Sequence, residues 1–190
     1  QKKRNQRAFE QASVDIAQLR QQAHDGDIEL AYLDECGFAQ THPNRRAWTP
    51  VGQQHCIRAA PKGKRLNVMA ALLCDASVHA RAYWENTNSD VFIGFVYELF
   101  KRATKPLTII LDNASMHHAK AIRPHLKHLQ RHGLTLYFLP AYSPELNRIE
   151  KLWWQVKHRW MGVCWRDKDT LEQQVTTLLG KVGSELEFKF

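Results

Sequence analysis

The chain has 190 residues, a formal net charge of +8 and 44% hydrophobic residues, which suits one domain built around a single apolar core. No apolar run is long enough to cross a membrane and the N-terminus lacks the apolar centre of a signal peptide, so we expect a cytoplasmic protein with no membrane partner. The four cysteines form no C-x-x-C pair, which argues against a zinc ribbon or a disulfide framework.

The first part of the chain predicts a helix followed by antiparallel strands. Apolar residues recur every three or four positions over residues 1–24, which is typical of a helix. The segment 28–35, "IELAYLDE", alternates apolar and polar residues and ends in carboxylates, which predicts a strand. We expect a shorter strand over 45–52 and a third, apolar enough to be covered on both faces, over 65–74.

Helices and strands alternate in the second part. The predicted elements are a helix over 90–103, a strand over 105–115, a helix over 117–133, a strand over 134–140, the helix that contains Glu150, and a helix over 167–183. Pro124 is interpreted as a local irregularity within its helix. This order predicts an α/β fold with a mixed five-stranded sheet, in which three antiparallel strands precede parallel strands joined by helices on both faces.

The positive charge is unevenly distributed. No acidic residue lies between Glu35 and Asp75, where six Lys or Arg residues occur, and Asp112 is the single acid between Lys101 and Gly133. This distribution favours a polyanionic partner, and a solvated basic surface is the alternative. Three histidines of one predicted helical face, His125, His128 and His132, have no acid or cysteine beside them, so we favour a solvated or phosphate-facing surface over a zinc site.

Three carboxylates stand at positions that the predicted fold would bring together. Asp34 ends the first strand, Asp112 ends the fourth, and Glu150 lies in the first turns of the late helix. If the first and fourth strands are neighbours, these groups meet at one edge of the sheet, where their repulsion requires a cation. Magnesium binds through such oxygens, and two ions about 4 Å apart suit phosphoryl transfer.

Two neighbouring acids compete with these assignments. Glu145 is an alternative third ligand, although its position at the start of the helix suits a carboxylate that stabilises the helix dipole. Glu35 points to the strand face opposite to that of Asp34. The helix phase supports Glu150, because the positions 146, 149, 153, 156 and 160 form the buried stripe and Glu150 lies on the adjoining flank.

Three segments, "YLDECGF", "IILDNASMHHA" and "LPAYSPELNRIEKLWW", resemble the signature blocks of the DDE transposases of the mariner superfamily, in particular their bacterial insertion-sequence relatives. The likeness covers roughly residues 28–160. It implies a ribonuclease H-like fold, a catalytic and metal-binding triad of Asp34, Asp112 and Glu150, Mg²⁺ or Mn²⁺ as two bound ions, and cut-and-paste transposition at TA dinucleotides. Arg148 stands where the family commonly has proline.

The resemblance also implies partners and supporting residues. The partners are the DNA of transposon ends and target, and a second copy of the chain in a homodimer associated with the nucleoid. Supporting roles are expected for Asn113, His117 and Asn147. The candidate phosphate contacts are Arg45, Arg46, Lys62, Lys64, Lys120 and Lys157.

These expectations divide the chain into a helix and linker over 1–27, a catalytic domain over 28–165, and a C-terminal helix and tail over 166–190. No segment resembles the upstream DNA-recognition region of the family, so we expect the chain to be a fragment. Two alternatives stay open. A ribonuclease H-like nuclease or resolvase would use the same triad without strand transfer, and a DNA-binding protein derived from a transposase would keep the fold without the chemistry.

Overall fold

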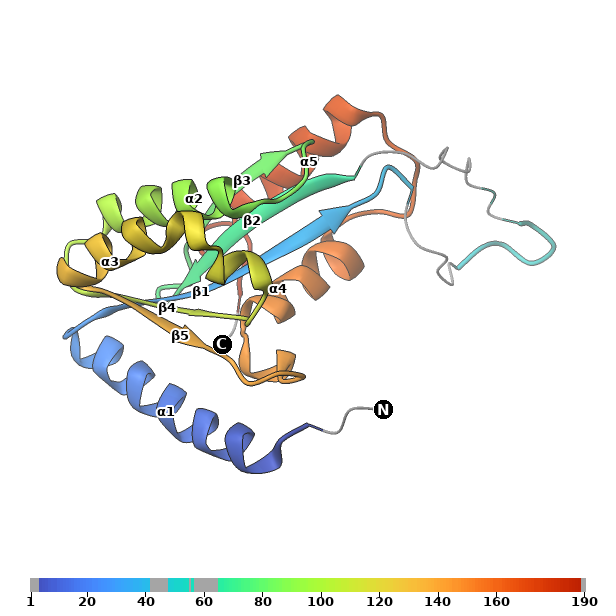
Figure 1. The fold of residues 1–190 in the computed structure, drawn as a ribbon. Helices are drawn as coiled ribbons and strands as arrows, with labels where there is room; N and C mark the ends of the chain where they lie inside the picture. The colour runs from blue at the N-terminus through green and yellow to red at the C-terminus, as the bar shows by residue number, and fades with distance from the viewer. Residues whose placement is uncertain (1–3, 42–47, 55, 57–64, 189–190) are drawn as a thin grey trace.

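The computed structural model describes residues 4–41, 48–54, 56 and 65–188. One five-stranded sheet organises them, with strand order β3-β2-β1-β4-β5 (Figure 1). The strands are β1 (Glu29–Phe38), β2 (Leu66–Leu73), β3 (Val78–Tyr83), β4 (Leu107–Leu111) and β5 (Leu134–Phe138). The pairs β1–β2 and β2–β3 are antiparallel, whereas β1–β4 and β4–β5 are parallel. The predicted mixed sheet is therefore confirmed.

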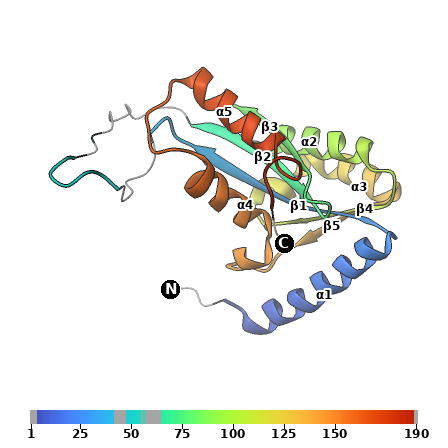
Figure 2. The same cartoon turned by 180° about the vertical axis from the view of Figure 1, so that it is seen from behind.

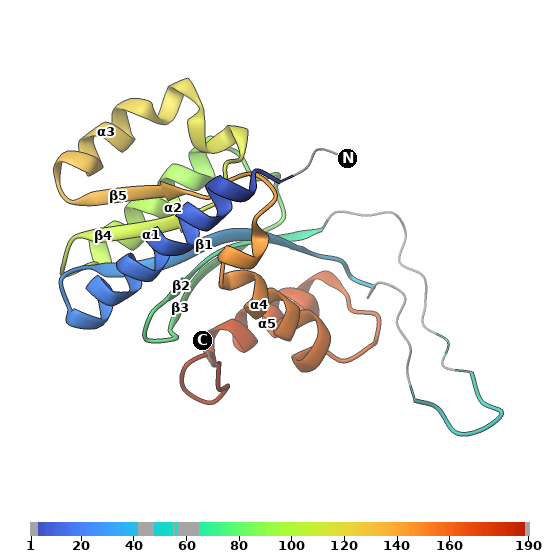
Figure 3. The same cartoon turned by 90° about the horizontal axis from the view of Figure 1, so that it is seen from below.

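Helices cover both faces of the sheet (Figures 2 and 3). The α-helices are α1 (Gln6–Asp25), α2 (Ser89–Arg102), α3 (Arg123–Arg131), α4 (Ile149–Gln155) and α5 (Lys168–Gly180). Short 3₁₀ turns occupy Ser115–His118, Lys120–Ile122 and Pro144–Leu146, and a π-helical turn, Val156–Trp160, extends α4. Within the described residues, none of these helices has both the length and the apolar run needed to span a bilayer.

The alternation of β1 divides the core into two layers. Tyr32 and Cys36 pack in the layer that contains α1, α4 and α5, whereas Ala31 and Leu33 pack in the layer that contains α2 and α3. Because successive side chains of a strand point to opposite faces, Asp34 shares the α4 side of the sheet with Tyr32. The strand period thus directs Asp34 towards the helix that carries Glu150.

The third antiparallel strand lies later in the chain than predicted. The strand expected over 45–52 is wrong for residues 48–52, which are not in a strand. The segment turns at 50–53, where the Gln53 N–H donates to the Pro50 carbonyl at 3.0 Å, and 45–47 lie outside the described residues. The third strand is β3, which pairs with β2. The hairpin between them turns at Asp75, whose Oδ1 accepts from the Ser77 N–H at 2.9 Å, so Asp75 is a turn residue.

Two helix predictions need correction. The helix expected over 117–133 is instead two 3₁₀ turns followed by α3, and Pro124 lies in the first turn of α3, where its missing N–H leaves no helical hydrogen bond unmade. The first helix begins at Gln6, and Asn5 caps it by accepting from the Ala8 N–H at 3.1 Å.

Candidate active site

Three predicted carboxylates line one pocket of about 290 Å³. Asp34 comes from β1, Asp112 directly follows β4, and Glu150 lies in the first turn of α4. The remaining lining residues come from the segments that follow β4 and β5, and they are Asn113, Ala114, Leu139, Pro140, Ala141, Tyr142, Ser143, Pro144 and Asn147. The parallel pairing of β1 with β4 brings the two aspartates to one side of the sheet, as the sequence predicted.

Asp34 is the most deeply placed of the three acids. Its Oδ2 accepts a hydrogen bond of 3.0 Å from Nε1 of Trp153, one turn beyond Glu150 on α4. Burial and, second to it, the negative charge of Glu150 raise the pKa of Asp34 to about 7, although the Trp153 bond opposes the rise. Asp34 and Glu150 are therefore close enough to repel each other, and a cation between them would relieve that repulsion.

Asp112 is held by a buried histidine. Its Oδ1 accepts from the Ala114 N–H at 3.1 Å and lies 3.2 Å from Nδ1 of His117. His117 is 2% exposed, and its ring is tilted against that of Phe92 with the centroids 4.4 Å apart. Its Nε2 lies 3.5 Å from Oε1 of Glu35. His117 thus links the acid at the end of β4 to an acid on β1.

The contact between Asp112 and His117 shifts the pKa values of the two groups in opposite directions. The bond from His117 lowers the pKa of Asp112 more strongly than burial raises it. Burial disfavours the charged form of His117, but the bonds to Asp112 and Glu35 outweigh it and raise the pKa of His117 to about 9. At neutral pH an imidazolium therefore lies between two carboxylates and orients Asp112.

The turn before α4 places Glu150. Asn147 is 3% exposed, and its Nδ2 donates to the Leu33 carbonyl at 3.0 Å, which ties the start of α4 to β1 immediately beside Asp34. The Glu150 N–H in turn donates to the Asn147 carbonyl at 3.1 Å. Glu145, the competing acid, does not line the pocket and forms an ion pair with Arg4. Asn147, for which a supporting role was expected, is therefore a buried residue that holds the start of α4 against β1.

The pocket is rich in oxygen atoms that suit a hard cation. Ser143 Oγ and Asn147 Oδ1 are buried and have no hydrogen-bond partner among the described residues, and both residues line the pocket beside the carboxylates. Oxygen donors of this kind are the ligands that Mg²⁺ and Mn²⁺ prefer. In the part of the chain that the structure describes, no three His, Cys, Asp or Glu side chains are yet close enough to enclose an ion, so the carboxylates would have to turn towards it.

The predicted DNA contacts are only partly placed. Arg45, Arg46, Lys62 and Lys64 lie outside the described residues. Lys120 is exposed on a 3₁₀ turn, and Lys157 lies two turns after Glu150 with its Nζ 5.2 Å from the ring centroid of Phe38. Asn113 lines the pocket, and its Oδ1 contacts Nε2 of His118.

Sequence reasoning missed two residues of the site. Trp153 was predicted as a core residue and is buried, but it also donates to Asp34. Glu35 was set aside because it faces away from Asp34, yet that orientation is what lets it reach His117. A buried indole N–H usually finds a partner, which was the available signal for Trp153. His117, the partner of Glu35, lies 82 positions away, so the residues around Glu35 in the sequence gave no signal of this contact.

A comparison with protein families identifies the family of this chain. The profile of the family described as DDE superfamily endonuclease matches residues 29–172, which include β1 to β5, α4 and all three pocket carboxylates. The chain belongs to the DDE superfamily endonucleases. A search of the curated proteins found no match to this chain.

Solved structures similar to this chain include several of Mos1 transposase. The Mos1 paired-end complex with Mg aligns with a TM-score of 0.67 and 16% identity over 91% of this chain and 53% of that one. The Mos1 strand transfer complex gives a TM-score of 0.64 and 17% identity over 91% and 52% of the two chains. The Mos1 catalytic domain gives 0.63 and 14% identity over 91% and 79%. These likenesses show the ribonuclease H-like fold, and the chain spans about half the length of the Mos1 chains in the two complexes.

Proposed function

We propose that this chain is the catalytic part of a DDE transposase, which cleaves DNA at transposon ends and joins the freed ends to target DNA. The observation that carries the proposal is the meeting of Asp34, Asp112 and Glu150, from three separate segments, on one oxygen-rich pocket. The family match and the Mos1 structures with transposon ends, with Mg and with Mn support it. The bacterial insertion-sequence branch, the homodimer and insertion at TA are part of the same proposal.

The protein groups have distinct tasks in this proposal. Asp34, Asp112 and Glu150 hold Mg²⁺ or Mn²⁺ as two ions, which when bound supply Lewis-acid activation of the attacking oxygen and stabilisation of the leaving oxygen. Trp153 keeps Oδ2 of Asp34 directed towards α4. His117 orients Asp112, and Asn147 keeps Glu150 opposite Asp34. A buried residue therefore contacts the carboxylates of Asp34 and Asp112 before any ion binds, and Asn147 fixes the backbone that carries Glu150.

DNA would approach over the rim of the acidic pocket. Lys120 and Lys157 follow Asp112 and Glu150 in the sequence and carry positive charge. Further phosphate contacts are proposed for Arg45, Arg46, Lys62 and Lys64, which lie outside the described residues. Contacts of this kind predict that binding weakens steeply with salt concentration.

The test is cleavage of a supercoiled plasmid and of a duplex with the element's ends, in Mg²⁺ and in Mn²⁺. Asp34→Asn, Asp112→Asn and Glu150→Gln should each lower the rate by about 100-fold or more, because each removes a charge that acts on the reacting groups. Glu145→Gln is the matched control, since that acid lies in the turn before Glu150 but outside the pocket, and it should retain its rate. Undiminished cleavage by any of the three variants would contradict the assignment.

The products separate this function from its alternatives. Joined products, in which a 3′ hydroxyl of the end is covalently linked to target DNA, support transposition. Cleaved ends that are never joined, with a donor that carries both transposon ends, would support the nuclease or resolvase. A folded protein that binds DNA but shows no metal-dependent cleavage would support the inactive derivative.

A further inference from the structure

A large aromatic side chain lies exposed on the helix that carries the third acid. Trp154 is 55% exposed, whereas the adjacent Trp153 is 3% exposed and packs in the core. Trp154 follows Glu150 by four residues, so the two side chains lie on the same face of α4, one turn apart. The exposed indole therefore lies beside the acidic pocket that Glu150 lines.

Cationic side chains surround this indole. The ring of His158 stacks on it with the centroids 5.5 Å apart, and Cζ of Arg159 lies 6.0 Å from its centroid. Residues five apart do not share a face of a regular α-helix, but the π-helical turn Val156–Trp160 adds a residue to the turn and brings Arg159 back beside Trp154. No acidic residue occurs between Glu150 and Asp167, so this face of the helix is positively charged.

A further pocket, which we call the basic pocket, lies farther along the same helix. It has a volume of about 310 Å³ and is lined by Gly37, Phe38, Ala39, Thr41, Arg65, Lys157 and Met161. Lys157 follows Glu150 by seven residues, which corresponds to about 10 Å along a helix axis. Among the described residues, neither Arg65 nor Lys157 forms an ion pair with a carboxylate.

The floor of the basic pocket is apolar and holds one of its cations. Phe38 is 3% exposed, and Nζ of Lys157 lies 5.2 Å from the centroid of its ring, within the range of a cation–π contact. Lys157 also follows Trp154 by three residues, so the two side chains are neighbours on the helix surface. The acidic pocket, the exposed indole and the basic pocket therefore follow one another along α4 and its π-helical turn.

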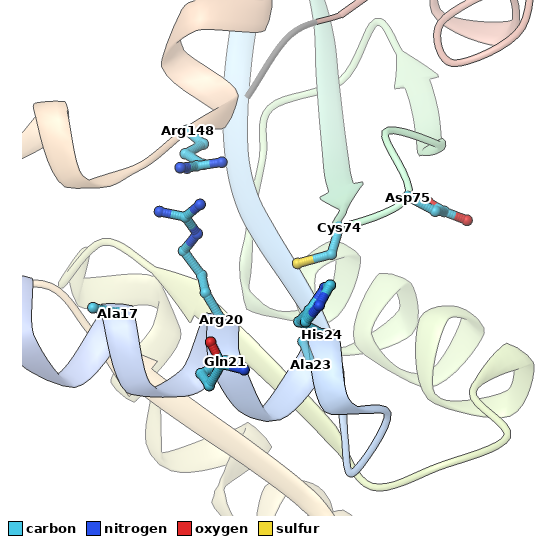
Figure 4. A pocket seen from close by; sticks show the side chains of 8 residues that line it. All are labelled: Ala17, Arg20, Gln21, Ala23, His24, Cys74, Asp75 and Arg148. Carbon is cyan, nitrogen blue, oxygen red and sulfur yellow. The ribbon is translucent and has the colours of Figure 1, made fainter.

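Another cavity, of about 600 Å³, lies on the α1 side of the sheet (Figure 4). It shares no lining residue with the acidic pocket or the basic pocket. None of its described lining residues is Phe, Tyr or Trp, so a base that entered it would meet no such ring. Only the α4 side thus offers an exposed indole next to the carboxylates, among the surfaces that line these three cavities.

We propose that Trp154 and the basic pocket bind an unpaired strand of DNA beside the acidic pocket, with a base on the indole and a backbone phosphate between Arg65 and Lys157. This inference rests on the proposed function and specifies the form of its substrate. An exposed ring stacks on the face of a base, and a base inside a duplex has both faces covered by its neighbours, so the indole selects an unpaired nucleotide. The guanidinium of Arg65 and the ammonium of Lys157 donate to the phosphate oxygens.

The experiment measures binding in EDTA, so that it is independent of cleavage. Fluorescence anisotropy follows a labelled oligothymidylate, whose bases cannot pair with one another, and a GC-rich blunt duplex of the same length, over a range of salt concentrations. The variants are Trp154→Ala, Trp154→Phe and the double variant Arg65→Gln/Lys157→Gln. Lys127→Gln is the matched charge control, because Lys127 is exposed on α3 and lines neither pocket.

Trp154→Ala should weaken binding of the oligothymidylate by roughly 5- to 50-fold and binding of the duplex by less than about 2-fold. Trp154→Phe should recover part of the loss, because a phenyl ring still stacks on a base. The double variant should lower the slope of log affinity against log salt for the oligothymidylate by about 1, whereas Lys127→Gln should leave it close to that of the unsubstituted chain.

Three results would overturn the inference. They are unchanged binding of oligothymidylate by Trp154→Ala, an equal loss for both DNAs in that variant, and a lower molecular mass in solution with unchanged DNA binding, which would make Trp154 part of an interface between copies of this chain. The proposed function is judged separately, by metal-dependent cleavage and the triad variants. A chain that cleaves DNA but does not use Trp154 to bind oligothymidylate therefore contradicts this inference alone.

Discussion

The indole Nε1 of Trp153 donates a 3.0 Å hydrogen bond to Oδ2 of Asp34, across 119 positions of the chain. This bond joins the helix of the third acid to the strand of the first. It also favours the ionised form of a carboxylate that burial and Glu150 push towards neutrality. Trp153 is therefore a positioning residue whose loss should be visible in the pH dependence of the reaction.

Trp153→Phe keeps an aromatic ring in the core and removes the donor. The pKa of Asp34 should rise above its present value of about 7, so less of the carboxylate is ionised at neutral pH. We expect metal-dependent cleavage at pH 7 to fall by roughly 3- to 10-fold and to recover towards pH 9. The measurement is a pH–rate profile, with Trp160→Phe as the control, and superimposable profiles for the two variants would refute the role.

Asp34→Asn should stabilise the metal-free protein. The folded pKa of about 7 lies above the ordinary value of 3.8, so the stability linked to this group is present below pH 3.8 and is lost as the pH rises through about 7. A neutral amide avoids that loss. In EDTA at pH 8.5 the variant should gain on the order of 1–4 kcal/mol in unfolding free energy, and much less at pH 4.

Urea unfolding at the two pH values measures this gain. Asp27→Asn, which changes an exposed acid outside the pocket, serves as the control and should show no comparable gain. A destabilised Asp34→Asn at pH 8.5 would mean that the carboxylate contributes to the fold rather than opposing it.

Divalent metal should stabilise the chain in a pH-dependent manner. An ion must displace the proton of Asp34, so its effect on the unfolding temperature should grow as the pH rises through about 7. We expect Mg²⁺ or Mn²⁺ to raise the unfolding temperature more at pH 8 than at pH 6, and EDTA to reverse the rise. Glu145→Gln should respond as the unsubstituted chain does, and Asp34→Asn should not; an equal response from both variants would place the ion elsewhere.

His117 should stabilise the fold below pH 9. Its folded pKa of about 9 exceeds the ordinary 6.5, so its contribution is complete below pH 6.5 and is lost as the pH rises through about 9. His117→Gln should therefore be most destabilising near pH 6, and the deficit should shrink by on the order of 1–3 kcal/mol by pH 10. Urea unfolding across this range checks it against His128→Gln, an exposed change, and a deficit that does not vary with pH would show that the imidazolium is absent.

Local patterns were sufficient for most of the fold. The period-2 alternation of 28–35 and the helical spacing of 90–103 correspond to β1 and α2, because hydrophobic periodicity depends on neighbours within a few residues. The prediction failed for β3, which is an edge strand. Ala80 and Ala82 on one of its faces are small, so the composition of the segment does not indicate a strand, and its pairing with β2 is seen only in the fold.

The sequence by itself determined most strands and helices, the basic character, and the three acids that the parallel pairing of β1 and β4 brings to one pocket. Only the tertiary structure decided which side chains hold those acids: Trp153 on Asp34, His117 between Asp112 and Glu35, and Asn147 on the backbone of β1. It also decided that Arg65 and Lys157 line one pocket beyond the exposed ring of Trp154. Such contacts join residues far apart along the chain, and their geometry depends on how whole helices lie on the sheet, which no local pattern contains.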